Sequence, residues 1–400
     1  MNRRIRPIGC SLADLARFDF DAPVDRTGSD SGKWAKYAGR DVIPLWVADM
    51  DFAAPPAVLA ALHERVDHGV FGYNQPTMSQ TQAVINHLAG WFDYRAEPEW
   101  IVWLPGLVTG LNVACRAVGE QGDAVFSATP IYPPFLSAPT FGGRQIVTTP
   151  LVCEENTWRW DWSAVDSVLA ANLASKRARL FELCHPHNPV GRVWNVDELK
   201  QIAALAEKHD LIVCSDEIHN GLILSASHQH RLFASLGNEI AARTITLMAP
   251  SKTFNIPGLG AAFAIISEPG LRRRFRAAMN GIVPHVNALG MVATEVALAR
   301  CDDWHDALIA YLRGNAHMVE RTVGALPGLS MAPVEATYLA WIDARALGLP
   351  HPAKYFESHG LGLSDGADFG APGYVRLNFG TRRALLEQAL DRLGTAVRAA

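Results

Sequence analysis

Ala249-Pro250-Ser251-Lys252-Thr253-Phe254-Asn255 is the stretch that decides how this chain is interpreted. It sets one lysine between a short apolar run, residues 245–248, and a segment that contains glycines. A lysine in such a place can act as an amine nucleophile that holds a carbonyl compound as a Schiff base. Ser-Lys-Thr on its own would fit a surface turn better. Asn188-Pro189-Val190-Gly191 and Asp216-Glu217 change that balance, because both lie upstream of the lysine and next to apolar runs.

The size and composition of the chain describe an ordinary globular protein. Its 400 residues are enough for two or three domains of about 150 residues, or for one large domain with an appended lobe. Hydrophobic residues make up 49% and charged residues 19%, as in typical globular domains. The net charge of -4 argues against a nucleic-acid partner. The apolar run 258–266 is shorter than the roughly 20 residues that span a bilayer, so we expect no membrane partner either.

The cysteines and the N-terminus indicate a reducing compartment. The six cysteines are scattered, without a C-x-x-C pair, which argues against a disulfide framework and against a metal site. The N-terminal residues 1–6 are basic, but no apolar segment of a secretory signal follows them. We therefore expect a cytoplasmic protein without a bound metal.

Strand-like and helix-like segments alternate through the middle of the chain. Residues 196–209 have apolar side chains at helical spacing. Short apolar runs that are typical of buried strands cover residues 124–127, 180–184, 211–215, 244–248 and 260–266. This alternation predicts an α/β fold with a mostly parallel, doubly wound sheet. Ligands bind such sheets at the carboxyl ends of the strands, and the motifs discussed here follow strand ends.

The C-terminal part has a different pattern. Residues 338–342 and 374–378 form short strand-like runs, and residues 382–397 form a helical one. We expect a smaller α+β domain made of residues 1–48 and 291–400, with residues 49–290 as the large domain. No linker rich in proline or glycine marks the boundary between them.

Three of the motifs fit three chemical handles of pyridoxal phosphate (PLP). Its aldehyde needs an amine, for which Lys252 is the candidate, and the same amine can remove a substrate Cα proton. Its ring nitrogen stays protonated beside a buried carboxylate, which Asp216 can supply after its strand. Its phenolic oxygen needs a donor such as the Asn188 amide. Taken singly, Asp216 also fits a turn or helix cap, and Asn188 also fits an ordinary turn.

Weaker signals exist for the phosphate, the ring face and a substrate. A loop that opens a helix at Gly106 offers backbone N–H groups to a phosphate, although glycines there more often mark a turn. Tyr132 follows a strand and could stack on the ring or belong to the core. Arg376 lies in an apolar strand and could clamp a carboxylate of an amino acid or form an internal salt bridge.

Together these pieces resemble fold-type I PLP enzymes of the aspartate-aminotransferase type, over most of the chain. The closer resemblance is to the MalY/PatB group of cystathionine β-lyases, also called C–S lyases. The motifs that carry it are Lys33-Trp34 and residues 44–52 (PLWVADMDF), 69–73 (GVFGY), 132–135 (YPPF), 186–194 (PHNPVGRVW), 215–219 (SDEIH), 250–255 (PSKTFN) and 375–378 (VRLN).

The resemblance implies a role for each of these residues. Lys252 would be the Schiff-base lysine, Asp216 the partner of the ring nitrogen and Asn188 the partner of the phenolate, and Tyr132 would stack on the ring. The substrate carboxylate would be held by Arg376, with Asn188 and the backbone around Ala48. The remaining cofactor contacts would be Gly106, Leu107 and Val108 at the loop and helix start, together with His219 and Ser251. Tyr73 would reach the phosphate of a neighbouring subunit, which implies a homodimer.

Three positions depart from the aminotransferase pattern. Many aminotransferases have a tyrosine three residues after the ring aspartate, where this chain has His219. They also often have a serine three residues before the lysine and an arginine eight residues after it, where this chain has Ala249 and Gly260. These differences resemble the lyase group and leave open which side chain balances the phosphate charge.

The reaction predicted from these residues and the resemblance is β-elimination from a cysteine-type amino acid such as cystathionine, which gives a thiol, pyruvate and ammonia. An aminotransferase with the same handles is the first alternative. The second is a regulatory or partner-binding protein that keeps the fold without its chemistry. The intact set of Lys252, Asp216, Asn188 and Arg376 argues against that second alternative.

Overall fold

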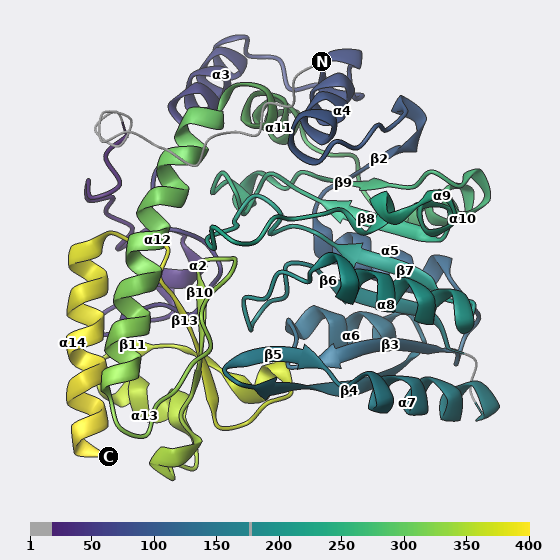
Figure 1. The fold of residues 1–400 in the computed structure, drawn as a ribbon. Helices are drawn as coiled ribbons and strands as arrows, with labels where there is room; N and C mark the ends of the chain where they lie inside the picture. Colours follow the sequence, from purple (N-terminus) through teal and green to yellow (C-terminus); the bar gives the residue numbers. More distant parts are fainter. Residues whose placement is uncertain (1–17, 176–177) are drawn as a thin grey trace.

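An eight-stranded sheet lies at the centre of the computed structural model, which describes residues 18–175 and 178–400 (Figure 1). The strands follow the order β2-β9-β8-β7-β6-β3-β4-β5 across the sheet. They are β2 (Ile101–Leu104), β3 (Ala124–Thr129), β4 (Gln145–Glu154), β5 (Thr157–Trp160), β6 (Ala178–Cys184), β7 (Ile212–Asp216), β8 (Thr244–Met248) and β9 (Ala262–Ile265).

The sheet is parallel from β4 through β3, β6 and β7 to β8, and only its margins are antiparallel. β9 runs antiparallel to both β2 and β8, and β5 runs antiparallel to β4. The prediction of a mostly parallel α/β sheet is confirmed. The segments 101–104, 145–154 and 157–160 were not predicted as strands. In the last two, at most half of the side chains are buried and no continuous apolar run marks them.

Helices cover both faces of this sheet, because the strands bury side chains on both sides. In β6, Leu180 and Cys184 pack with one set of helices, whereas Phe181 and Leu183 pack with the other. The first set is α5 (Leu107–Ala117), α6 (Pro133–Phe141) and α10 (Pro269–Met279), and the second is α7 (Trp162–Ser175), α8 (Val196–Lys208) and α9 (Asn238–Ala242). This is the doubly wound arrangement that alternating strands and helices predict.

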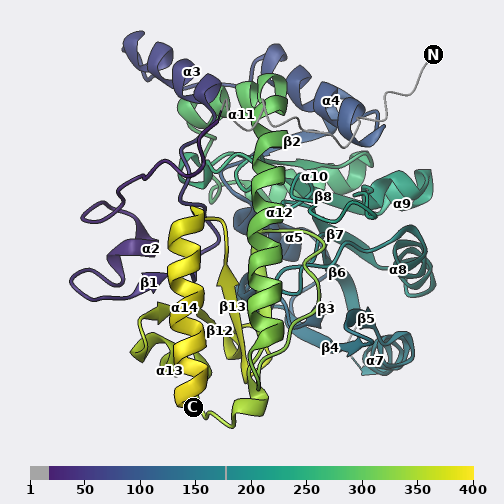
Figure 2. The ribbon, with the colours of Figure 1, turned by 60° about the vertical axis from the view of Figure 1, so that its left-hand side comes forward.

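A second region holds two small sheets and the longest helices. β10 (Leu339–Asp343), β13 (Tyr374–Asn378) and β12 (Ser364–Asp365) form an antiparallel sheet in that order. β1 (Ile43–Pro44) pairs with β11 (Leu361–Gly362), so an N-terminal segment is bound to the C-terminal part of the chain. Figure 2 shows α12 (Asp302–Ala325) and α14 (Arg383–Ala399) beside this region; α13 (Pro352–Ser358) and α2 (Gly32–Ala35) complete it.

The predicted domain limits at residues 48 and 290 stay a prediction. Residue 290 lies inside α11 (Ala288–Arg300), which packs against α3 (Pro56–Asp67) and α4 (Met78–Phe92). We propose that the second boundary lies at Cys301 instead, where α11 ends and α12 begins.

The parallel strands bring three sequence motifs to one edge of the sheet. Asn188 follows β6, Asp216 ends β7 and Lys252 follows β8, and these strands are direct neighbours. Within residues 18–175 and 178–400, no helix combines the length and apolar character needed to cross a membrane, and no group of three His, Cys, Asp or Glu side chains is placed to hold a metal ion.

Candidate active site

Lys252 stands in a tight turn that follows β8. The Phe254 amide donates to the Pro250 carbonyl at 2.9 Å, which folds the turn back on itself. Lys252 is half-buried, and its Nζ donates to the carbonyl oxygen of Ala48. Burial and the nearby Arg376 cation lower the pKa of Lys252 to about 8, against the opposing effect of acidic neighbours. The amine is therefore close to deprotonation at physiological pH, as a nucleophile or general base requires.

Asp216 is a buried carboxylate without a counter-ion in the described part of the chain. Its Oδ1 accepts a hydrogen bond from the Ile218 amide at 3.0 Å, an Asx turn of the kind that an aspartate in a turn makes. Burial, with a smaller effect of Glu217, raises the pKa of Asp216 to about 7. A cation beside this carboxylate would restore its ordinary acidity.

Asn188 and Arg376 come together although 188 residues separate them in sequence. Arg376 Nη1 donates to Asn188 Oδ1 at 3.0 Å, and Nη2 donates to the Trp46 carbonyl at 2.8 Å. The guanidinium is 4% exposed and contacts no carboxylate of the described residues, while its Nε has no hydrogen-bond partner among them. No described group accepts from the Asn188 amide nitrogen. The internal salt bridge that the sequence left open for Arg376 is therefore not found here.

Tyr132 and His219 border the same space. Tyr132 precedes α6, donates its amide to the Asn188 carbonyl at 3.1 Å, and packs against the clusters on both faces of the sheet. Burial raises the pKa of its phenol. His219 is buried, and burial followed by the Lys252 and Arg376 cations lowers its pKa to about 3. The imidazole is therefore neutral, and its Nδ1 has no partner among the residues described.

The N-terminus of α5 lies at the same edge of the sheet as the lysine turn, because it follows β2, which runs in the same direction as β8 on the other side of β9. Gly106 precedes the helix, and Leu107 belongs to the same buried cluster as Ala249. The first N–H groups of a helix lack acceptors within it, so those of Leu107 and Val108 are available to an anion. Ser251 is half-buried beside Lys252 in the adjacent turn.

Tyr73 is the one predicted site residue that lies apart. It is fully exposed in the segment between α3 and α4, where Val70 and Phe71 are exposed as well. It makes no contact with the lysine turn of its own chain, and its predicted role in a neighbouring subunit stays a prediction.

Sequence reasoning gave no role to the side chains that bind the segment 46–52. Asn378 donates to the carbonyls of Val47 and Asp49, and Asn255 Nδ2 donates to those of Met50 and Phe52. Tyr338 donates to the Ala48 carbonyl at 2.9 Å. These side chains fix an irregular backbone beside Lys252. The only sequence signals were that Asn255 and Asn378 lie within the motifs 250–255 and 375–378, and that Tyr338 begins the strand-like run 338–342.

A family model described as aminotransferase class I and II matches residues 40–393. The chain belongs to the aminotransferase class I and II family. Cystathionine beta-lyase PatB of Bacillus subtilis is 36% identical over 391 residues, which cover 95% of this chain and 100% of PatB. The predicted resemblance to the MalY/PatB group is thereby confirmed.

Two solved structures extend the comparison. The crystal structure of OvoB has 46% identity and a TM-score of 0.91, and the match covers 96% of this chain and 100% of OvoB. Cystalysin from Treponema denticola, whose crystal structure contains a pyridoxal 5'-phosphate cofactor, has 32% identity and a TM-score of 0.90, with 96% and 99% of the two chains covered. The similarity therefore extends over the whole fold.

Gly260 explains one departure from the common pattern of aminotransferases. Its φ of 56° is left-handed, and a Cβ at this position would lie 3.2 Å from the Pro105 carbonyl oxygen. An arginine here would therefore be strained and would push on the loop that opens α5. In this chain, the glycine at position 260 allows that loop to pack closely against it.

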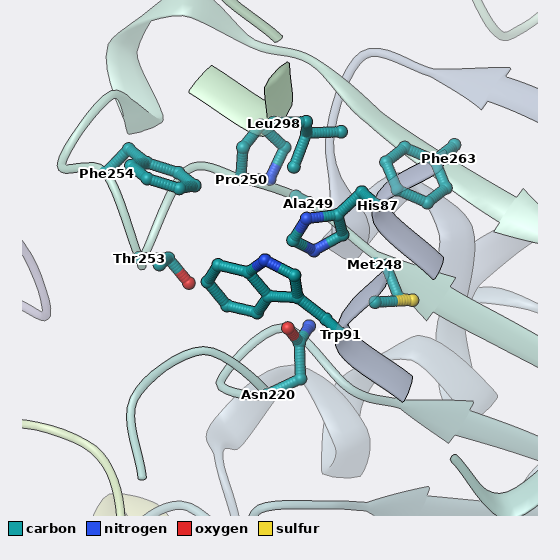
Figure 3. A pocket seen from close by; sticks show the side chains of 10 residues that line it. All are labelled: His87, Trp91, Asn220, Met248, Ala249, Pro250, Thr253, Phe254, Phe263 and Leu298. Carbon is teal, nitrogen blue, oxygen red and sulfur yellow. The ribbon is translucent and has the colours of Figure 1, made fainter. Parts of the chain in front are cut away.

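A small cavity lies behind the lysine turn and is distinct from the site. Figure 3 shows His87 and Trp91 of α4 in it, with Asn220 below them and Pro250, Thr253 and Phe254 of the turn around them. Its volume of about 10 Å³ reaches only what one water molecule occupies. Lys252, Asp216, Asn188 and Arg376 do not line it. The cavity belongs to the packing that supports the turn.

Proposed function

We propose that this protein is a PLP-dependent cystathionine β-lyase, or more broadly a cysteine-S-conjugate β-lyase. One observation carries the proposal: Lys252, Asp216, Asn188 and Arg376 meet at one edge of the sheet with unfilled polar capacity. Among the described residues, Asp216 and Arg376 have no ion-pair partner, the Asn188 amide nitrogen has no acceptor, and Lys252 binds a neutral carbonyl. Buried groups in that state are costly unless a ligand completes them. The names of PatB and cystalysin, and the cofactor of the latter, support the same assignment.

The residues present fit PLP at each of its polar groups. Lys252 would hold the aldehyde, and Asp216, which lacks a counter-ion, would lie at the positively charged ring nitrogen. The Asn188 amide nitrogen and the neutral imidazole of His219 would donate to the phenolic oxygen. Tyr132 would cover the ring. Ser251 and the N–H groups after Gly106 would bind the phosphate.

Arg376 would hold the substrate. Its guanidinium has no carboxylate partner in the part of the chain that the structure describes, and it is already fixed by Asn188, the Trp46 carbonyl and the Ser364 hydroxyl. A substrate carboxylate would supply the missing negative charge and could use the Nε donor. This contact sets the amino acid beside the segment 46–48, so that its Cα lies near the Lys252 amine.

Lys252 would then act as the general base. When bound, PLP supplies an aldehyde that takes up the substrate amine and a protonated ring that withdraws electrons from Cα. The neutral Lys252 amine takes the Cα proton; the electron pair left behind forms a Cα–Cβ double bond while the Cβ–S bond breaks, and sulfur leaves as a thiolate. Addition of water balances the reaction: R–S–CH2–CH(NH3⁺)–COO⁻ and H2O give RSH, pyruvate and NH4⁺.

We further propose that the protein is a cytoplasmic homodimer. The exposed apolar residues of the segment around Tyr73, namely Val66, Val70, Phe71 and Met78, are suited to burial against a second copy. Tyr73 would reach the phosphate of the partner's cofactor. The cysteines in the described part of the chain are free thiols, which supports a reducing compartment.

The test is to mix the PLP-loaded protein with L-cystathionine, without a keto acid, and to follow pyruvate and free thiol. Sustained, equimolar release of both is expected over many turnovers. Lys252→Ala should lose at least about 1,000-fold in rate, because it removes both the general base and the cofactor anchor. Turnover that starts only after a 2-keto acid is added would contradict the lyase and establish an aminotransferase.

A further inference from the structure

Thr337 has a strained backbone close to the active site. Its φ of 77° is left-handed, a conformation that is rare for a β-branched residue. The residue is fully buried and directly precedes Tyr338. Strain of this kind persists only where the surroundings enforce it, and it is concentrated at functional sites.

Hydrogen bonds from both sides enforce the conformation. The Thr337 amide donates to the Leu222 carbonyl at 2.9 Å, and the Leu222 amide donates to the carbonyl of His219 at 2.9 Å. On the other side, the Phe379 amide donates to the Tyr338 carbonyl at 2.9 Å. The turn is therefore tied to the loop after Asp216 and to the strand that carries Arg376.

The strained turn aims the Tyr338 phenol at the carbonyl that Lys252 uses. Tyr338 Oη donates to the Ala48 oxygen at 2.9 Å, and Lys252 Nζ donates to the same oxygen. The phenol is buried, and burial together with Asp49 raises its pKa far above the physiological range, so it remains a donor. The edge of its ring faces the neutral His219 at 6.4 Å between centroids. Two donors thus share one acceptor.

We propose that Tyr338 is a positioning residue for the Lys252 amine: its phenol shares the Ala48 carbonyl with Lys252, which limits the hold of that carbonyl on the charged amine and keeps the neutral amine free to take the substrate Cα proton. The inference rests on the proposed function. Arg376 binds the Trp46 carbonyl, so the substrate carboxylate and Cα lie on this side. A neutral amine on this side reaches the Cα proton, whereas an ammonium bound to Ala48 cannot accept it.

The first experiment uses cofactor-free protein and the variant Tyr338→Phe, which keeps the ring and removes the hydroxyl. Acetic anhydride labels the neutral amine, and mass spectrometry gives the fraction of Lys252 acetylated at each pH. Without the competing donor, the Ala48 carbonyl binds the Lys252 ammonium more strongly. The labelling midpoint should rise by about half a pH unit or more. Asp49, Asp216 and Arg376, the other charges that act on Lys252, are unchanged.

Tyr311→Phe is the matched control. Tyr311 is also a buried tyrosine with a hydrogen-bonded hydroxyl, but its partners are Asp21 and the Arg383 amide. Its midpoint should equal that of the wild type. Thermal melting shows whether each variant is folded. An unchanged or lowered midpoint in folded Tyr338→Phe would overturn the proposal.

The second readout uses the PLP-loaded proteins. In Tyr338→Phe, kcat for pyruvate release should fall about threefold near pH 7, with an unchanged KM, and should approach the wild-type value near pH 9, because the raised midpoint leaves less neutral amine only at the lower pH. A pH profile of kcat that equals that of the wild type would refute the role of Tyr338 in positioning the base. If the wild type releases no pyruvate, the proposed lyase fails, whereas the labelling midpoint still decides whether Tyr338 positions Lys252.

Discussion

Arg192 and Arg376 are equally buried but have opposite surroundings. Arg192 is 6% exposed, and its two terminal nitrogens each bind a carboxylate, Glu335 at 2.8 Å and Glu198 at 2.6 Å. Arg376 is 4% exposed, and within residues 18–175 and 178–400 its guanidinium binds only neutral oxygens. Burial lowers the pKa of Arg376 to about 10. A buried cation without an anion is unfavourable, so the surroundings of Arg376 are suited to bind a negatively charged ligand.

The same contrast exists between adjacent residues. Glu217 accepts from His230 at 2.7 Å, Ser215 at 2.9 Å and the Phe233 amide at 3.1 Å. Among the described residues, the carboxylate of Asp216, one residue earlier, accepts only from the Ile218 amide. Completed polar networks hold the fold together, whereas incomplete ones at the strand ends mark the place of a ligand.

Replacing Arg192 and Arg376 in turn should separate a role in stability from a role in substrate binding. Arg192→Met leaves Glu198 and Glu335 without their cation, so we expect a loss of about 3–5 kcal/mol in the free energy of unfolding. The KM for cystathionine should stay within a few-fold of the wild type. Arg376→Met is the matched variant and should cost much less stability, because it leaves no carboxylate unpaired. Urea denaturation measures both. Equal losses of stability in the two variants would contradict the difference that we infer between Arg192 and Arg376.

The fold could be predicted because its elements have local signals. Residues 196–209 show the helical period, and the helix begins after Asn195, which forms a capping box with Glu198. The central strands of the sheet are buried on both faces and read as continuous apolar runs. β4 and β5 at the margin lack that signal. The predicted domain limit at residue 290 stays a prediction; it falls inside α11, where no break in composition marks a boundary.

The site was predictable in its parts but not in its connections. Lys252, Asp216 and Asn188 each follow an apolar strand, which placed them at one sheet edge. Nothing local indicates that Arg376 binds Asn188, because that contact joins a strand of the small sheet to the loop that follows β6 of the large sheet. The sequence also gave no sign that Lys252 and Tyr338 donate to the same Ala48 carbonyl, because tertiary contacts determine the backbone conformation there.

A second variant sharpens the contrast between the two arginines without removing charge. Arg376→Lys keeps a cation but loses the planar fork that binds a carboxylate with two parallel bonds. We expect KM for cystathionine to rise about 10–100-fold, with little change in the rate of Lys252 acetylation. Arg192→Lys should leave KM unchanged. A KM for Arg376→Lys that equals the wild-type value would show that the substrate carboxylate binds elsewhere.

The smallest expected effect is the pH dependence of stability that Asp216 produces. Burial raises the pKa of Asp216 to about 7 in the cofactor-free fold, whereas an unfolded chain holds it near 3.8. Below pH 3.8 the carboxyl is protonated in both states; between these values the folded state binds more protons, so its contribution to stability falls as pH rises. Between pH 6 and 7 the cofactor-free wild type should lose about 1 kcal/mol relative to Asp216→Asn. Binding of PLP should abolish this difference in slope, because its ring cation lowers the pKa of Asp216. Parallel curves of the free energy of unfolding against pH for the two cofactor-free proteins would show that Asp216 is already paired.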